Sequence, residues 1–159
     1  MYEVSRELVE RGHKVTIVTE KFDDDSAEHQ ESEGIEVYRI PVGKNIWLKK
    51  FTIWQWLIRH KRLIRNAHII HCHDVFFWYL PFRLFYLTKK VYTTFHGYEG
   101  NEVPSKRSIL MHKIAEKLSM GNICVGGFFQ KWYGTKPTIT TYGAIDENKK
   151  NITGADKKN

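Results

Sequence analysis

The stretch KVYTTFHGYEG, residues 90–100, joins a run of β-branched and aromatic residues to a histidine and a glycine. Such a run is typical of a strand, and the glycine suits the turn that follows it. A turn needs the glycine, but nothing about a turn needs His96. The kind of sheet to which this strand belongs therefore decides whether the histidine has a role.

Runs of the same character recur along the chain. They predict strands in HKVTIVTE (13–20), GIEVYRIP (34–41), AHIIHCH (67–73), NICVGG (122–127) and TITTYGAI (138–145). Several are apolar on both faces, which is typical of strands covered on both sides and therefore of a parallel sheet. Helical patterns fill the intervals at 2–12, 47–65, 75–88 and 104–120. The alternation predicts an α/β domain with a doubly wound, mainly parallel sheet.

The composition agrees with a single globular domain. A length of 159 residues suits one core, which we assign to 1–146, followed by a polar, disordered tail at 147–159. Cys72 and Cys124 both lie in apolar, strand-like runs, which favours a reducing, cytoplasmic setting. No apolar run approaches the roughly 20 residues that span a bilayer, and the N-terminus lacks the apolar core of a signal peptide.

In an open parallel sheet, ligands bind outside the carboxyl ends of the strands. The sequence places His73-Asp74, His96-Gly97, Gly126-Gly127 and Tyr142-Gly143 at such ends. Glycine lets a ligand approach the backbone, and an imidazole can donate a hydrogen bond to a hydroxyl or phosphate oxygen. The alternative, that the histidine merely caps the strand and the glycine merely turns the chain, stays open.

The segment HCHD, 71–74, has the composition of a metal site. Strand alternation puts His71 and His73 on one face and Cys72 on the other. Two histidines can share a metal, but zinc needs further ligands, and no partner motif of Cys or His occurs elsewhere. We therefore predict no metal, and keep a substrate-binding role open for His73 and Asp74.

The excess charge of +7 comes from one basic segment, because no acidic residue occurs between Val37 and His73. There, a helical repeat of Trp47, Phe51, Trp54 and Ile58 predicts a core helix with solvated charges. Basic residues interleaved with tryptophan are also typical of helices on anionic membranes, so both interpretations remain open. Nucleic acid is disfavoured because no recognised binding motif accompanies the charge. The residues predicted for membrane contact are Trp47, Lys49, Lys50, Trp56, Arg59 and Arg62.

Five segments, in the right order and spacing, resemble the N-terminal domain of a GT-B glycosyltransferase of family 4. They are YEVSRELVERGHKVTIVTE (2–20), GIEVYRIP (34–41), AHIIHCHD (67–74), VYTTFHGYEG (91–100) and TYGAID (141–146). The third resembles the family's Asp-hydrophobic-hydrophobic-His-x-His segment and the fourth its Thr-x-His-Gly-x-Glu segment.

The resemblance implies a Rossmann-like domain that shapes the acceptor side of a cleft. It implies transfer of a sugar from a nucleotide-sugar donor to a glycan or lipid-linked acceptor, with retained configuration and no metal or other cofactor. By position, His96 matches the histidine that contacts the transferring sugar. Gly97 would allow close approach, and Glu99, His73, Asp74 and Gly143 are candidates for substrate binding.

Departures from the family pattern limit what the chain is expected to do alone. The family's first strand and its C-terminal, donor-binding domain are not in the sequence, and Tyr142 stands where the family often has Asn. We therefore expect a chain truncated at both ends and inactive by itself, with the missing domain as its partner. The expected location is the cytoplasm, including the inner face of the cell membrane. Two alternatives are a non-catalytic α/β module that docks on a membrane or protein, and a nonfunctional fragment.

Overall fold

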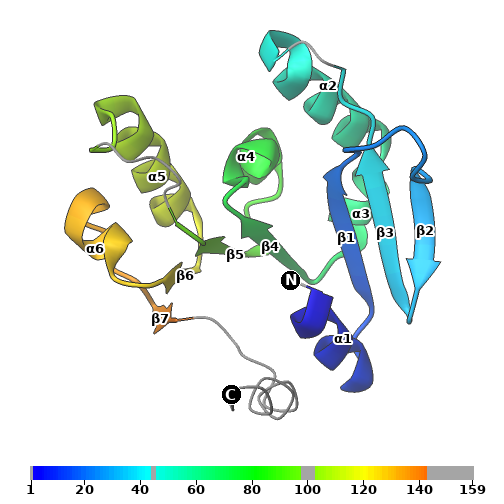
Figure 1. The fold of residues 1–159 in the computed structure, drawn as a ribbon, viewed down its shortest axis with the longest axis horizontal. Helices are drawn as coiled ribbons and strands as arrows, with labels where there is room; N and C mark the ends of the chain where they lie inside the picture. Colours follow the sequence, from blue (N-terminus) through cyan, green and yellow to red (C-terminus); the bar gives the residue numbers. More distant parts are fainter. Residues whose placement is uncertain (1, 44–45, 98–102, 143–159) are drawn as a thin grey trace, which may run out of the picture. The chain divides into compact units, whose positions relative to one another are not determined.

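The computed structural model describes residues 2–43, 46–97 and 103–142, and the chain divides into two compact units on either side of the Arg65–Asn66 bond (Figure 1). Each unit has its own sheet and its own buried residues. The predicted tail at 147–159 lies outside the described residues, as do Glu99 and Gly143.

The first unit is built on a three-stranded sheet in the order β1-β3-β2. Its elements are α1 (Tyr2–Glu10), β1 (Val15–Glu20), β2 (His29–Ser32), β3 (Ile35–Ile40), α2 (Ile46–Arg59) and α3 (Lys61–Asn66). Strands β1 and β3 are parallel, whereas β2 is antiparallel to β3. The two antiparallel strands are joined by Glu33 and Gly34, whose φ angles of 52° and 76° are those of a tight hairpin turn.

Helix α2 packs through a different face from the one that its apolar repeat predicts. Ile53 and Leu57, one turn apart, are buried, while Phe51 and Ile58 are 64% and 60% exposed. The prediction that Phe51 and Ile58 belong to a core stripe is therefore wrong, because the opposite side of the helix fills the core. The predicted helix at 47–65 is also two helices, since α2 ends at Arg59 and α3 begins at Lys61.

The second unit has a four-stranded, all-parallel sheet in the order β4-β5-β6-β7. Its elements are β4 (Ile69–His73), α4 (Phe76–Phe85), β5 (Lys90–Phe95), α5 (Lys106–Leu118), β6 (Gly121–Val125), α6 (Phe128–Tyr133) and β7 (Ile139–Thr141). Each helix connects two neighbouring strands, and the three helices lie over the same face of the sheet (Figure 1). The predicted class, a Rossmann-like α/β fold with a parallel sheet flanked by helices, is confirmed.

Strand β5 supplies the centre of this core. Val91, Thr93 and Phe95 alternate toward the helices and are all buried, and burial of each large apolar side chain contributes about 1.5–3 kcal/mol. The hydroxyl of Thr93 lies 2.7 Å from that of Ser119, which donates in turn to the carbonyl oxygen of Ala115. Because its polar atoms are satisfied in this way, β5 is firmly attached to α5.

No helix among the described residues is long and apolar enough to cross a bilayer. Both cysteines are free and buried, Cys72 in β4 and Cys124 in β6.

Candidate active site at the ends of β4 and β5

Asp74 ties together the carboxyl ends of β4 and β5. Its backbone N–H donates to the carbonyl oxygen of Thr94, and its Oδ1 accepts from the backbone N–H of His96, both at 3.0 Å. To make both bonds the residue adopts a left-handed backbone with φ of 58°, which aspartate tolerates better than most residues. Backbone strain of this kind is concentrated at functional sites. The side chain therefore fixes the point at which His96 leaves the sheet.

Three histidines gather beside this turn. In the parallel register His73 lies opposite Thr94, so His71, His73, Thr94 and His96 project from one face of the sheet. Nδ1 of His73 lies 2.8 Å from Nε2 of His96, and Nε2 of His71 lies 2.8 Å from the hydroxyl of Thr94. The rings of His71 and His73 are 4.3 Å apart. The sequence predicted each strand end separately, and the structure brings His73 and His96 into direct contact.

The environment keeps His73 uncharged. Burial, and to a smaller extent the neighbouring His71 and His96, lower its pKa to about 4. A neutral ring has one donor and one acceptor nitrogen, so the bond between His73 and His96 requires one ring to donate and the other to accept. The contact occupies Nε2 of His96 and Nδ1 of His73.

Gly97 follows His96 with a backbone that a side chain would strain. Its φ is 150°, and a Cβ at this position would meet no atom within 4 Å. At the end of β6, Gly126 has a φ of 81° and its N–H donates to the carbonyl oxygen of Thr141 at 2.7 Å. That N–H is used within the sheet, whereas Gly97 directly follows His96 and the space beside its Cα is empty within 4 Å of a Cβ.

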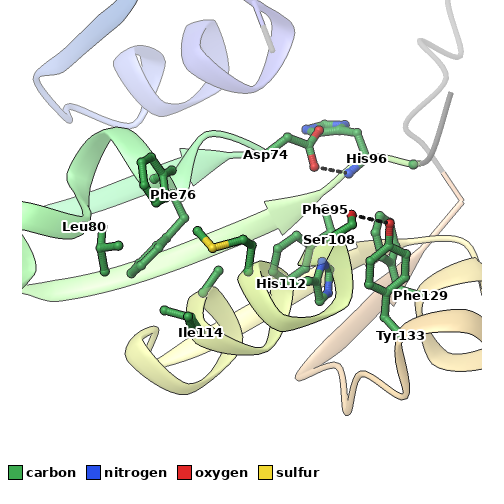
Figure 2. A pocket seen from close by; sticks show the side chains of 14 residues that line it. Asp74, Phe76, Leu80, Phe95, His96, Ser108, His112, Ile114, Phe129 and Tyr133 are labelled. Carbon is green, nitrogen blue, oxygen red and sulfur yellow. Dashed lines mark hydrogen bonds between the residues drawn. The ribbon is translucent and has the colours of Figure 1, made fainter. Parts of the chain in front are cut away.

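A cavity of about 580 Å³ begins at the same strand ends. Asp74, His96 and Gly97 form its rim, and α4, α5 and α6 form its walls (Figure 2). No pattern in the sequence predicts this cavity. The helical pattern at 104–120 indicated that one side of α5 faces the sheet, but a repeat does not reveal where neighbouring helices leave space between them.

His112 forms part of the cavity wall. Its Nε2 lies 2.8 Å from the hydroxyl of Thr135, and its ring lies 3.7 Å from that of Phe95 and 4.9 Å from that of Phe129. Burial lowers the pKa of His112 to about 4, outweighing the opposite effect of Glu116. The wall is therefore uncharged near neutral pH.

The Glycosyltransferase Family 4 profile matches residues 1–133, which is most of the chain. The chain belongs to glycosyltransferase family 4. No curated protein gives a significant match. The matched range covers β1 to β6 and helices α1 to α6, so both units are part of the family 4 domain. The chain therefore carries a domain of the glycosyltransferase type, and His73 and His96 lie within the matched residues.

The residues that the sequence predicted for membrane contact lie in the first unit of this family 4 domain. Lys49 forms a 2.6 Å ion pair with Glu20 of β1, and the Trp56 ring stacks on that of His60 at 3.8 Å. The side chains of Lys50, Arg59 and Arg62 are exposed, whereas the side chain of Trp47 lies outside what the structure describes. The predicted set therefore includes partly buried side chains, Lys49 and Trp56, as well as exposed ones.

In the described part of the family 4 domain, no three His, Cys, Asp or Glu side chains gather closely enough to hold a metal ion. His71 and His73 are neighbours, but Cys72 points to the other face and is buried. The groups at this strand end, the imidazoles of His73 and His96 and the backbone at Gly97, can act on a ligand through hydrogen bonds.

Proposed function

We propose that this chain is the acceptor-side domain of a retaining glycosyltransferase. It moves a sugar from a nucleotide-sugar to a glycan or lipid-linked acceptor at the cytoplasmic side of the cell. It needs a second, donor-binding domain for activity and uses no metal. The observation that carries the proposal is the His73–His96 pair, held by Asp74 at the carboxyl end of the sheet in a family 4 chain.

His96 has the chemistry for contact with a transferring sugar. A neutral His96 donates from Nδ1 only if its Nε2 accepts, and Nδ1–H of His73 can supply that bond at 2.8 Å. In this arrangement His73 positions His96 and fixes its tautomer. A preorganised donor of this kind stabilises charge that develops on sugar and phosphate oxygens in the transition state. The open backbone of Gly97 allows the sugar to come close.

The test combines the chain with a carboxyl-terminal, donor-binding domain and offers a panel of nucleotide-sugars and acceptors. We expect transfer from at least one donor, and none from the chain alone. His96→Ala should lower kcat by about 10²–10³-fold, the loss typical of one transition-state hydrogen bond. A reunited protein that transfers no sugar from any donor would refute the proposal.

A matched control separates catalysis from a general effect of losing a histidine. His68 is exposed and precedes β4, at the end of the strand remote from Asp74. His68→Ala should leave transfer unchanged. If His68→Ala and His96→Ala lost activity equally, the role assigned to His96 would be wrong.

A second candidate function, docking on an anionic membrane, is favoured by the outer face of α2. Leu48, Phe51 and Ile58 are exposed and recur with helical spacing on the side opposite the buried Ile53 and Leu57. Exposed Lys50 and Arg59 accompany them on the same helix. An exposed apolar stripe with basic neighbours is the pattern of helices that lie in the membrane interface.

Vesicle flotation tests this candidate. The chain should float with vesicles that contain phosphatidylglycerol and remain below with phosphatidylcholine alone. Phe51→Asp should abolish flotation, while Val4→Asp, the same kind of change at an exposed position of α1, should not. Flotation that survives Phe51→Asp would exclude α2 as the contact.

A further inference from the structure

The cavity lies on the helix-covered face of the sheet in the second unit, whereas the imidazole pair lies on the other face. Phe95 is buried toward the helices and lines the cavity. Because side chains alternate along a strand, the side chain of His96 projects from the opposite face, together with that of His73. Figure 2 shows Phe95 and His96 on opposite sides of the strand end. The interior of the cavity is therefore a separate site from the imidazole pair.

The walls of the cavity are apolar and rich in aromatic rings. The aromatic side chains of the lining are those of Phe76, Phe77, Phe95, Phe129 and Tyr133. Helices α4 and α5 add Leu80, Met111 and Ile114, which are only partly buried although they are large and apolar. The space of about 580 Å³ is within the range of small-molecule binding sites.

The rings beside β5 form a cluster that an aromatic ligand can extend. The ring centroid of His112 lies 3.7 Å from that of Phe95 and 4.5 Å from that of Tyr133. The rings of Phe129 and Tyr133 are 5.3 Å apart. Aromatic pairs at such distances attract each other beyond the effect of burial alone, and a saturated ring of the same size gains only the burial. The lining therefore favours an aromatic ligand over an aliphatic one.

The charges around the cavity restrict the ligand further. Its lining, all of it in the described part of the chain, includes no lysine or arginine. Burial lowers the pKa of His112 to about 4, so this ring is uncharged near neutral pH. The one carboxyl group, Asp74, is at the rim and accepts from the backbone N–H of His96. An anion would lose its hydration and find no counter-charge inside, which is costly, so the interior suits an uncharged molecule.

Two hydroxyl groups supply a polar contact within the aromatic wall. Oγ of Ser108 and the phenolic oxygen of Tyr133 lie 3.3 Å apart, and both residues line the cavity (Figure 2). This distance is long for a bond between two hydroxyls. One such bond also uses only one of the two hydroxyl hydrogens, so the other can be donated to a ligand. A hydroxyl group on the ligand would find a partner at this point.

We propose that the cavity bounded by α4, α5 and α6 binds a small, uncharged aromatic molecule that carries a hydroxyl group, a phenol in chemical class. The aromatic ring fills the space beside Phe95 and Phe129, and the hydroxyl bonds to Ser108 and Tyr133. The site adds a second ligand to this domain, beyond the sugar of the proposed transfer.

The test compares probes that each differ from the first in one property. They are β-naphthol, the anion β-naphthoate and the saturated decahydro-β-naphthol, each titrated at pH 7 into labelled protein and followed by amide NMR shifts. We expect β-naphthol to shift amides of α4, α5 and α6 saturably, and to bind roughly tenfold more tightly than β-naphthoate. It should bind roughly threefold more tightly than its saturated analogue. Equal affinity for β-naphthol and either of the other probes would overturn the proposal.

Two tryptophan substitutions on α5 locate the ligand. Met111→Trp fills the cavity and should weaken β-naphthol binding roughly tenfold, whereas Leu110→Trp, at an exposed neighbouring position, should leave it unchanged. If Met111→Trp does not fold, Ile114→Phe is measured in its place. Binding that persists in a folded, cavity-filling variant would show that the ligand lies elsewhere.

Two further variants test the orientation and the face. Ser108→Ala should weaken β-naphthol binding about fivefold and leave the binding of naphthalene unchanged, because only the first probe has a hydroxyl. His96→Ala should leave both affinities unchanged, since its ring lies on the other face of the sheet. Loss of β-naphthol binding in His96→Ala, or equal effects of Ser108→Ala on the two probes, would refute the assigned position.

Discussion

Buried His112 should make the second unit lose stability in mild acid. The pKa of His112 is about 4 in the folded protein, below the ordinary value of 6.5 that it regains on unfolding. Below pH 6.5 the unfolded chain therefore binds a proton that the folded chain excludes. The stability that comes from keeping His112 uncharged is therefore fully present above pH 6.5 and is lost as the pH falls toward 4.

The size of this loss of stability follows from the difference in proton binding by His112 between the folded and the unfolded chain. A pKa difference from 6.5 to about 4 lowers the free energy of unfolding by about 2 kcal/mol between pH 7 and pH 5. The total by pH 4 is about 3 kcal/mol, at 1.36 kcal/mol for each pKa unit. This is a large fraction of the 5–15 kcal/mol that typically stabilises a domain, as an order of magnitude.

The assay compares wild type with His112→Gln by urea unfolding at pH 7 and pH 5, followed through the amide signals of β5. Glutamine does not titrate, and its amide can still bond the hydroxyl of Thr135. The wild type should lose about 2 kcal/mol more than the variant between the two pH values, while His68→Gln, at an exposed site, should behave as wild type. Equal losses in wild type and His112→Gln would refute the reasoning.

Three further predictions concern stability and thiol reactivity. Within the described residues the buried hydroxyl of Tyr79 has no hydrogen-bond partner, so Tyr79→Phe should raise the free energy of unfolding by about 1 kcal/mol; a loss on urea unfolding would reveal a partner. At Gly34, with φ of 76°, an added Cβ would lie 2.9 Å from Cγ1 of Val9, so Gly34→Ala should destabilise by about 2 kcal/mol. Gly43→Ala, where a Cβ meets nothing within 4 Å, should be neutral, and equal unfolding midpoints would contradict the contrast. Burial raises the pKa of Cys72 to about 12, so its thiol should react with a disulfide reagent only as fast as the unit opens; immediate labelling of the native protein would contradict this.

The strands of the parallel sheet could be predicted because each is a short run rich in β-branched and apolar residues, although the described helices cover only one face of the sheet. The hairpin strand β2 could not, since its sequence HQES is polar and its turn uses Glu33 before Gly34 in place of the usual Asn or Asp. Helix α6 was missed for a different reason: six residues are too short to display a helical repeat.

The face of α2 shows the limit of periodicity. Phe51 and Ile58 form as good a repeat as Ile53 and Leu57, and the two sets lie on opposite sides of one helix. A helix that is apolar on two sides does not specify which one packs inward. The choice is made by the sheet beneath it, which the repeat does not contain.

The candidate site was predictable in its parts but not in its contacts. Strand-end reasoning selected His73, Asp74, His96 and Gly97 because each follows an apolar run. The bond between the two imidazoles depends on the register of β4 against β5, and the role of Asp74 depends on its left-handed backbone. Neither feature leaves a signal in the local sequence.

The position of β4 in its sheet has a dynamic consequence. Within the described residues β4 is an edge strand, hydrogen-bonded to β5 alone, whereas β5 is bonded on both sides. Edge strands open at lower free energy than interior ones. The His73–His96 contact therefore joins a strand that can detach to one that stays in place. Local opening of β4 would separate the two rings, so that His73 would no longer fix the tautomer of His96. The cavity walls on α5 would remain folded.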